Sequence, residues 1–392
     1  MTRPPETILL RNARLVLPDR ITKNSSLLIR DGRITSVADP ADRRSLKADA
    51  VIDLESLTLF PGFIDLHIHG AAGIDTMDAD AAGLRRISEF LATQGVTAWL
   101  PTLVPAPDGD YTRAIAAIEE AMRSTAGARI LGVHYEGPFV NSMQCGALRQ
   151  QYFRSFVNTD ALDSLPLLAN PAAVHMMTVA PEIEGGIELV HQLKRRGWII
   201  SIGHTRAEWG VLHQASAAGA LHMTHFMNAM APLHQRAPGP IGWGLLRDDV
   251  TCDVIADGVH LDRHALALIL KNKGAERLML ISDAIAAAGL GDGDYEIWGE
   301  SISVKNGRTR NERGNIAGSV ISLLDAVRTM ETLGVSEVNL ARLTATNSAK
   351  LLAIDSECGS IEEGKRADLV ALNAERKTVL VMVNGQVLVR SA

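Results

Sequence analysis

Strand-like and helix-like segments alternate along residues 61–284, and this alternation restricts the fold more than any other feature of the chain. Eight short apolar runs have the character of buried strands. They cover residues 62–69, 96–102, 130–136, 174–180, 198–204, 220–225, 251–256 and 277–283. Helical segments lie between several of them, at residues 79–94, 111–124, 185–196 and 207–218. Eight strands with intervening helices predict an α/β fold, a (β/α)8 TIM barrel. The alternative is a doubly wound open sheet, but no G-x-G-x-x-G motif follows a strand.

The two ends of the chain have a different, β-rich character. Strand-like runs occupy residues 8–10, 13–17, 26–30 and 33–37 near the N-terminus, and residues 367–372, 378–383 and 386–389 near the C-terminus. Asp31-Gly32 and Asn384-Gly385 are strong hairpin signals between such runs. We therefore expect residues 1–59 and 360–392 to form one small β domain, with the barrel at residues 60–359. A loop with a hairpin is expected at residues 289–309, and helices at residues 322–333 and 340–353.

Composition excludes several classes of function. The 392-residue chain has a formal net charge of -6 and no basic block, which argues against nucleic acid as a partner. No apolar run reaches membrane-spanning length, and no signal-peptide pattern opens the chain, so we expect no membrane partner. Cys145, Cys252 and Cys358 are far apart in the sequence. They indicate reduced thiols and a cytoplasmic location rather than a disulfide framework or a thiolate zinc site.

The first predicted strand carries Asp65, His67 and His69. Side chains alternate along a strand, so these three share one face. Two imidazoles one residue apart can bind a single metal ion. An isolated H-x-H is more often a pair of hydrogen-bonded core histidines, so the metal hypothesis depends on the rest of the chain.

Other strands also end in ligand-type residues. Glu136, His204, His225 and Asp283 end the third, fifth, sixth and eighth predicted strands. Barrel enzymes build their sites at this C-terminal face, so the four residues should meet His67 and His69 there. Parity places His222 on the opposite side of its strand, and His134 one layer deeper than Glu136. The remaining strand-start and helical histidines are expected to be structural or exposed; they are His175, His191, His213 and His264.

The donor set predicts the type of metal. Imidazole and carboxylate together suit Zn²⁺, Fe²⁺ or Mn²⁺ better than Ca²⁺ or Mg²⁺, with Zn²⁺ the first expectation. Six ligand-type side chains exceed the needs of one tetrahedral ion. A site with one or two ions is therefore expected, with Glu136 placed to bridge them in the second case.

Several motifs, in order, resemble those of the N-acetylglucosamine-6-phosphate deacetylase family within the amidohydrolase superfamily. They are PGFIDLHIHG at residues 61–70, EGPF at 136–139, GHT at 203–205, THFMNAM at 224–230, IADGVH at 255–260, SDA at 282–284, AGS at 317–319 and GSIEEGKRADLV at 359–370. The resemblance implies the barrel and the small β-sandwich. It also implies hydrolysis of the acetyl group of N-acetylglucosamine 6-phosphate, giving glucosamine 6-phosphate and acetate in amino-sugar catabolism.

The resemblance also assigns roles to residues. Glu136, His204 and His225 would be the main metal ligands, His67 and His69 would leave room for a second ion, and Asp283 would be the catalytic acid and base. Ala147, Asn228, Ala229, Arg236 and His260 match substrate-binding positions. In the family the residue matching Arg236 reaches the phosphate across a homodimer interface, and a guanidinium fork suits phosphate.

One position departs from the family pattern. Leu148 stands where the family usually has a histidine that contacts the acyl carbonyl, and leucine cannot donate a hydrogen bond. Cys145 lies in the same loop and is expected to be incidental. The nearest alternative function is therefore deacetylation of another N-acyl amino sugar, such as N-acetylgalactosamine 6-phosphate. Ring opening of a cyclic amide is disfavoured because residues 174–190 contain no lysine to bridge two metals. A non-catalytic relative is disfavoured by the intact ligand set.

Overall fold

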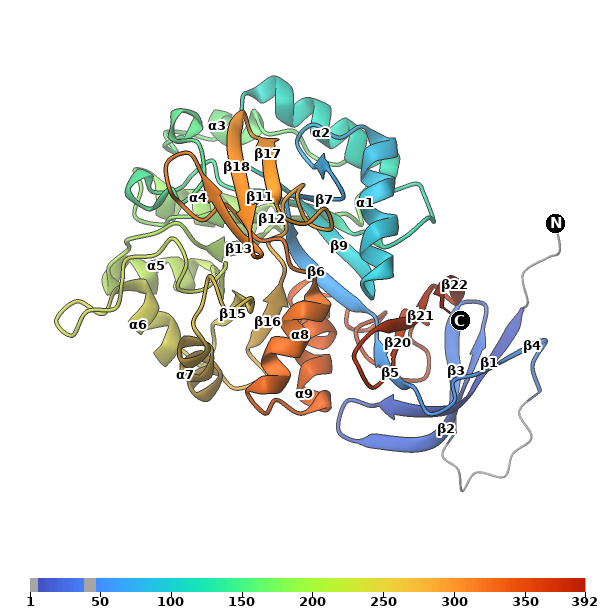
Figure 1. The fold of residues 1–392 in the computed structure, drawn as a ribbon. Coiled ribbons are helices and arrows are strands. Elements are labelled where there is room, and N and C mark those ends of the chain that lie inside the picture. Colours follow the sequence, from blue (N-terminus) through green and yellow to red (C-terminus); the bar gives the residue numbers. More distant parts are fainter. Residues whose placement is uncertain (1–5, 39–46, 392) are drawn as a thin grey trace.

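The computed structural model describes residues 6–38 and 47–391 and shows a large barrel beside a small β domain (Figure 1). The small domain contains strands from both ends of the chain, as predicted. They are β1 (Thr7–Val16), β2 (Ile21–Arg30), β3 (Arg33–Ala38), β4 (Ala50–Asp53), β5 (Thr58–Pro61), β20 (Leu369–Leu372), β21 (Thr378–Val383) and β22 (Gln386–Arg390). Its path is β22-β21-β20-β5-β1-β2-β3, with β4 paired to β1. β5 extends two residues past the expected domain boundary at residue 59.

The small domain folds back on itself around its own core. The Ile34 N–H donates to the carbonyl of Lys365 at 2.8 Å, so the edge of β3 meets the segment that leads into β20. Leu10, Leu27 and Leu369 are fully buried in the cluster inside. The runs at residues 8–10 and 13–17 were predicted as two strands, but they form one. Asn12 has φ +56, and the pairing of β1 with β2 shifts there, so a bulge lets the strand continue.

The large domain is the predicted parallel barrel. Its strands are β6 (Phe63–Ile68), β9 (Val96–Leu103), β10 (Arg129–Ile130), β11 (Gly132–Glu136), β12 (Val174–Val179), β13 (Ile199–Ile202), β14 (His222–Met223), β15 (Thr251–Ile255) and β16 (Leu278–Ile281). β10 and β11 are two pieces of the third predicted strand. The barrel closes just beyond β16, where the Asp283 N–H donates to the carbonyl of His67 at 3.0 Å. Closure therefore joins two of the predicted site residues through their backbones.

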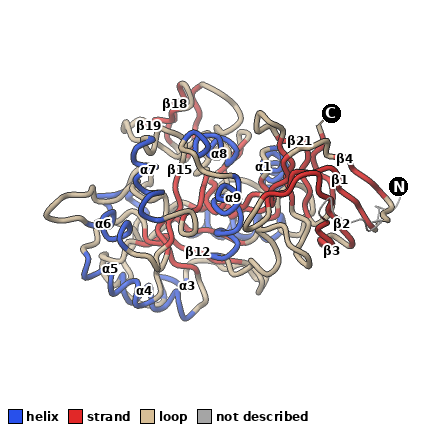
Figure 2. The backbone as a smooth tube through the Cα atoms, turned by 90° about the horizontal axis from the view of Figure 1, so that it is seen from below, coloured by secondary structure: helices blue, strands red, loops and turns tan. Residues whose placement is uncertain are grey.

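Helices cover the outside of the barrel and follow the predicted alternation (Figures 1 and 2). They are α1 (Ala81–Thr93), α2 (Asp108–Ala121), α3 (Asp160–Asp163), α4 (Gly186–Arg195), α5 (Trp209–Ala218), α6 (Gly239–Leu246) and α7 (Arg263–Lys273). α1 shows why these segments are helical. Asp80 caps its first turn by accepting the Gly83 N–H at 2.7 Å, and Leu84, Ile87 and Leu91 repeat at helical spacing on its buried face. No described helix is long and apolar enough to cross a bilayer.

The remaining elements surround the barrel mouth and its seam. Short strands and 3₁₀ turns are β7 (Gly70–Ala71), β8 (Ile74–Asp75), Ser142–Gln144 and Gln150–Tyr152. The predicted hairpin is a three-stranded sheet of β17 (Gly293–Ile297), β18 (Glu300–Lys305) and β19 (Arg308–Asn311). α8 (Leu323–Thr332) matches its prediction. The single helix expected at residues 340–353 is instead α9 (Glu337–Ala341), a π-helical turn (Arg342–Thr346) and α10 (Asn347–Leu351). The Thr344 hydroxyl donates to the carbonyl of Leu340 at 2.8 Å within this irregular stretch.

Candidate metal centre and catalytic cavity

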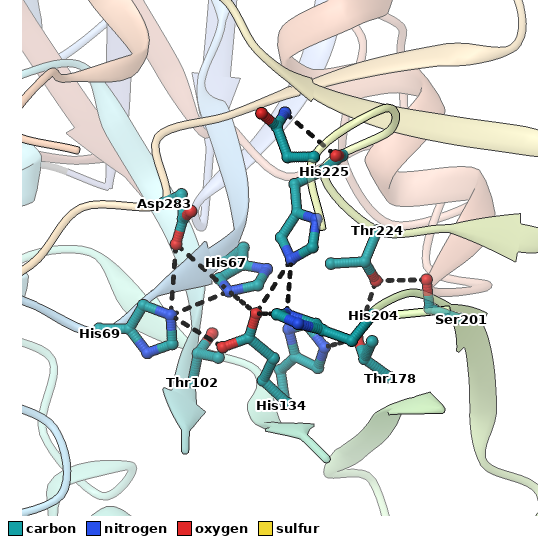
Figure 3. A network of polar contacts seen from close by, with 12 residues as sticks. His67, His69, Thr102, His134, Thr178, Ser201, His204, Thr224, His225 and Asp283 are labelled. Atoms are coloured by element: carbon teal, nitrogen blue, oxygen red, sulfur yellow. Dashed lines mark hydrogen bonds and ion pairs between the residues drawn. The ribbon is translucent and has the colours of Figure 1, made fainter. Parts of the chain in front are cut away.

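Six of the predicted residues converge at the C-terminal ends of the barrel strands (Figure 3). Each lies at or just beyond the end of its strand, and all six are at least 94% buried; they are His67, His69, Glu136, His204, His225 and Asp283. Parallel strands bring their carboxyl ends to one edge, which explains how residues so distant in sequence meet. Two groups of three could each hold an ion, and both contain Glu136.

The first group is Glu136, His204 and His225. Glu136 Oε1 lies 2.9 Å from His204 Nε2 and 3.0 Å from His225 Nε2, and the two Nε2 atoms are 3.1 Å apart. The second group is His67 and His69 with the same carboxylate. Their Nε2 atoms are 3.0 Å apart, and His69 Nε2 lies 3.3 Å from Glu136 Oε2. Oε1 of Glu136 thus faces His204 and His225, and it also lies 3.7 Å from His67 Nε2, whereas Oε2 faces His69.

The hydrogen bond of His204 tests whether a metal fits. Its Nδ1 lies 2.7 Å from the carbonyl oxygen of Gln144, and a carbonyl can only accept, so Nδ1 carries the proton. In the neutral tautomer that has its proton on Nδ1, the Nε2 lone pair points at a carboxylate oxygen. Two acceptors at 2.9 Å repel each other unless a cation lies between them. The donor set therefore fits a divalent ion bound by imidazole and carboxylate.

The electrostatics of the cluster favour positive charge. Burial opposes protonation of His69, but hydrogen bonds to Asp283 and Glu136 outweigh it and raise the pKa of His69 to about 10. The pKa of His225 rises to about 9, because Glu136 outweighs burial in the same way. Burial would raise the pKa of Glu136, yet the surrounding histidines hold it well below its usual range. The buried carboxylates of Glu136 and Asp283 are therefore stable as anions only beside positive charge, which either protons on the histidines or a metal ion can supply.

Asp283 lies between the second group and the cavity. Its Oδ1 is 3.2 Å from His69 Nε2 and 3.4 Å from His67 Nε2. Burial would raise the pKa of Asp283, but the charge of His67 and the hydrogen bond from His69 outweigh it and lower that pKa. The carboxylate is therefore ionised at neutral pH and can accept a proton. This is the state that a general base requires.

Strained backbone conformations gather at this site. His204, His225 and Asp283 have φ of +46°, +32° and +51°, although only glycine adopts positive φ without cost. Gly203 must be glycine for another reason, because a Cβ there would lie 2.6 Å from a Thr178 methyl group. Such strain persists only where the surrounding structure enforces it, and it is concentrated at functional sites.

Two bystander histidines lie where parity predicted. His222 faces away from the cluster, and its Nε2 lies 2.9 Å from Asp253 Oδ2. Asp253 Oδ1 also accepts the backbone N–H of His225, so this pair supports a ligand from behind. His134 lies deeper, with Nε2 at 2.8 Å from the Thr178 hydroxyl (Figure 3). Burial holds the pKa of His134 well below its usual range, so it stays neutral and belongs to neither metal group.

A cavity of about 250 Å³ opens onto the cluster. Four of the five predicted substrate-binding residues line it; they are Ala147, Asn228, Ala229 and His260. His260 is oriented by Asp257, whose Oδ2 lies 2.7 Å from Nδ1. Burial would raise the pKa of Asp257, but His260 outweighs it and lowers that pKa.

Arg236 is the exception among the predicted site residues. It lies exposed on the loop after β14, outside the cavity lining, and its guanidinium makes no ion pair with any described residue. Leu148 is 3% exposed and lines the cavity, so the departure from the family pattern lies within the site itself.

Sequence reasoning missed one wall of the cavity. Gly146, Trp298, Asn315, Ile316 and Gly318 line it but were given no role. Trp298 comes from the turn between β17 and β18, and the next three come from the segment after β19. The hairpin itself was predicted, and the AGS motif at residues 317–319 was noted. No spacing rule, however, places an inserted hairpin over a barrel mouth, so its contact with the site could not be inferred.

Comparison with known proteins agrees with the geometry. Residues 58–388 match the amidohydrolase family. The chain is 35% identical over 389 residues to an N-acetylglucosamine-6-phosphate deacetylase of Bacillus subtilis, covering 97% of each chain. It is 34% identical to an N-acetylgalactosamine-6-phosphate deacetylase of Escherichia coli O157:H7, covering 97% of this chain and 99% of that one.

A solved structure gives the same result. It is a mutant N-acetyl-D-glucosamine-6-phosphate deacetylase of Mycobacterium smegmatis in complex with N-acetyl-D-glucosamine-6-phosphate. It superposes with a TM-score of 0.89 at 28% identity, covering 98% of this chain and 99% of that one. The resemblance inferred from the motifs is thus confirmed: the chain belongs to the amidohydrolase family.

Proposed function

We propose that the protein hydrolyses the acetamide bond of N-acetylglucosamine 6-phosphate, giving glucosamine 6-phosphate and acetate in amino-sugar catabolism. The observation that carries this proposal is the position of Asp283. Its carboxylate lies within 3.4 Å of two candidate metal ligands and lines the same cavity as Asn228, Ala229 and His260. Deacetylases of 6-phosphorylated amino sugars, related over nearly the full length of the chain, support it further.

Glu136, His204 and His225 would hold the essential ion, and His67 and His69 would hold a second one together with the same carboxylate. Zn²⁺ is the expected metal, with Fe²⁺ or Mn²⁺ as alternatives. When bound, the metal supplies Lewis-acid polarisation and lowers the pKa of water towards about 7. The chain supplies the remaining chemistry. Asp283 takes the proton of the attacking water and passes it to the departing amine nitrogen, so that the C–N bond breaks with neutral amine as the leaving group.

Residues around the cavity would hold the sugar. Ala147, Asn228, Ala229 and His260 surround the space next to the metal groups. The exposed guanidinium of Arg236 would bind the 6-phosphate of a neighbouring site. This requires a homodimer, in which Arg236 of the partner subunit completes each cavity. The proposal also includes a cytoplasmic location. It divides the chain into a small domain of residues 1–59 and 360–392 and a catalytic domain of residues 60–359.

N-acetylgalactosamine 6-phosphate is the second candidate substrate. The E. coli relative that acts on this epimer is almost as similar as the B. subtilis enzyme, at 34% against 35% identity. The two sugars differ only in the configuration of one hydroxyl group. Leu148, in a position of substrate contact in the family, keeps this alternative open.

Acetate release from a panel of N-acyl amino sugars tests the proposal. The panel contains the N-acetylated glucosamine and galactosamine, each with and without the 6-phosphate. We expect the phosphorylated glucosamine compound to have the highest kcat/KM, and addition of a chelator to abolish release. Absence of acetate from both phosphorylated compounds in metal-loaded enzyme would contradict the function. A higher kcat/KM for the galactosamine compound would reassign the substrate.

A further inference from the structure

Trp298 occupies a backbone position that tryptophan rarely takes. It is the first residue of the two-residue turn between β17 and β18, where Ile297 pairs with Glu300. Trp298 has φ +55 and Gly299 has φ +73, the pattern of a type I′ turn, which favours Asn-Gly. The next turn of the same sheet has that preferred pair, Asn306-Gly307, at φ +53 and +71. Local turn chemistry therefore does not explain the tryptophan.

The indole occupies a position beside the metal cluster. Its ring lies edge-on to His69, with centroids 5.1 Å apart and an interplanar angle of 83°. It lines the catalytic cavity together with Leu148. The indole Nε1 is buried and has no hydrogen-bond partner among the described residues, so no polar contact of the nitrogen explains the position of the ring. The strained turn thus delivers a large flat side chain to the site.

The hairpin that carries Trp298 is held firmly. Ile297, Ile302 and Val304 pack against residues 285–287, which begin two residues after Asp283. Arg313 links the hairpin to the opposite loop. It forms an ion pair with Glu300 at 3.3 Å and donates to the carbonyls of Ala147 at 2.7 Å and Leu148 at 3.3 Å. One arginine therefore fixes the relative positions of the two elements that bear Trp298 and Leu148.

We propose that Trp298 and Leu148 form the acyl end of the cavity and restrict the N-acyl group to acetyl. This inference rests on the proposed deacetylase function and adds the residues that select the acyl group. The carbonyl to be attacked must lie at the metal ligands, and Trp298 touches one of them. The rest of the lining includes side chains that can hydrogen-bond a sugar, among them Asn228, His260 and Asn315, whereas an aliphatic and an aromatic side chain next to the metal ligands suit a methyl group. An apolar wall discriminates by size, at about tenfold or more for each methylene.

The test compares N-acetyl, N-propionyl and N-butyryl glucosamine 6-phosphate in the metal-loaded enzyme. We expect the wild-type kcat/KM to fall by at least about tenfold with each added methylene. Trp298→Gly opens the wall and suits the positive φ of the turn. It should raise the butyryl-to-acetyl ratio of kcat/KM by at least about tenfold. Trp298→Phe keeps an aromatic wall and should retain the wild-type preference. Both kcat/KM values of a ratio are measured on one enzyme preparation. A partial loss of folded protein therefore lowers both values equally and leaves the ratio unchanged.

Asn306→Gly is the matched control. It makes the same kind of change at the next turn, and Asn306 lies outside the catalytic cavity, so the ratio should stay at the wild-type value. An unchanged ratio in Trp298→Gly, with normal turnover of the acetyl compound, would overturn the inference and leave the deacetylase function standing. If wild-type enzyme released no carboxylate from any of the three compounds, the proposed function would fail and this inference with it.

Discussion

The two halves of the metal cluster share Glu136 but differ in how their histidines are held. In the first half, His204 Nδ1 donates to the Gln144 carbonyl at 2.7 Å, and the backbone N–H of His225 donates to Asp253. The buried Nδ1 atoms of His67 and His69 in the second half have no hydrogen-bond partner among the described residues, and neither has Nδ1 of His225, so His204 alone has its second ring nitrogen held in this way. Metal-binding histidines usually donate their second N–H to a carbonyl or carboxylate, which fixes the ring and its tautomer.

The difference indicates that the first half is arranged in advance for an ion. His67 and His69 instead depend on contacts within the cluster, chiefly with Glu136 and Asp283 at 3.2–3.7 Å. We infer that the first half binds the metal ion required for turnover, and that the second half holds at most an auxiliary ion. Variants in the first half should therefore lower turnover more than variants in the second half.

The largest effect is expected from the first half. His204→Ala or His225→Ala removes one of three ligands and should strip the metal and reduce turnover to background. Metal content by mass spectrometry and acetate release measure both effects. His191→Ala, on the exposed face of α4, is the matched control and should behave as wild type. Full activity of metal-depleted His225→Ala protein would contradict the ligand assignment.

Asp283→Asn should have the next largest effect. Asparagine keeps the shape of the side chain but cannot accept the proton of the water, so kcat should fall by about 10²–10⁴-fold. Metal content and thermal stability should remain close to wild type, because Asp283 is assigned to proton transfer and not to the first metal group. A kcat near the wild-type value would show that another group moves the proton.

The second half can be tested together with Leu148. If a second ion polarises the acyl carbonyl in place of the missing histidine, His67→Ala with His69→Ala should cost about 10²–10³-fold in kcat/KM, comparable to the loss of an oxyanion-hole donor. Adding Leu148→His to that double variant should restore part of the activity. Normal activity of the double variant would remove the second ion from the mechanism and reopen the substrate assignment.

Arg236 lies outside both halves and should affect only one part of the substrate. Arg236→Ala should weaken capture of the 6-phosphorylated sugar by about 2–4 kcal/mol, as when one partner of a buried charge pair is lost. Turnover of the unphosphorylated sugar should barely change. Arg195→Ala, an exposed arginine on α4, controls for loss of charge. Equal losses for both sugars would make Arg236 structural.

The barrel could be predicted because its signals are local. Each buried strand is a short apolar run, and a ligand-type residue at its end needs only parity to be assigned a face. His222 and His134 were placed correctly by that rule. The predicted bounds were wrong where a backbone irregularity changed the strand or helix that the local sequence pattern indicates. The bulge at Asn12 joined two runs into β1, and the π-helical turn at Arg342–Thr346 divided an expected helix.

The same limit applies to the site. His67, His204 and Asp283 follow from their strand positions, but Trp298 comes from a hairpin inserted after the barrel strands. Its contact with His69 depends on packing of Ile297 and Ile302 against residues 285–287, which sequence spacing does not reveal. The positive φ of Trp298 is equally invisible, because tryptophan gives no turn signal.

The smallest effect is expected at Asp253, which supports His225 of the first half, and it concerns metal affinity. Asp253 is fully buried and accepts both the His225 N–H and a hydrogen bond from His222. Asp253→Asn keeps one acceptor oxygen but presents an amide N–H to the other partner. It should lower metal affinity by about 10-fold, and Asp253→Ala by up to about 100-fold, the usual range for residues that orient a ligand. Titration with a competing chelator measures this affinity. Asp248→Asn, whose side chain is 84% exposed, should leave it unchanged. If Asp253→Ala bound metal as tightly as wild type, His225 would not need its support, and the contrast between the two halves would rest on His204 alone.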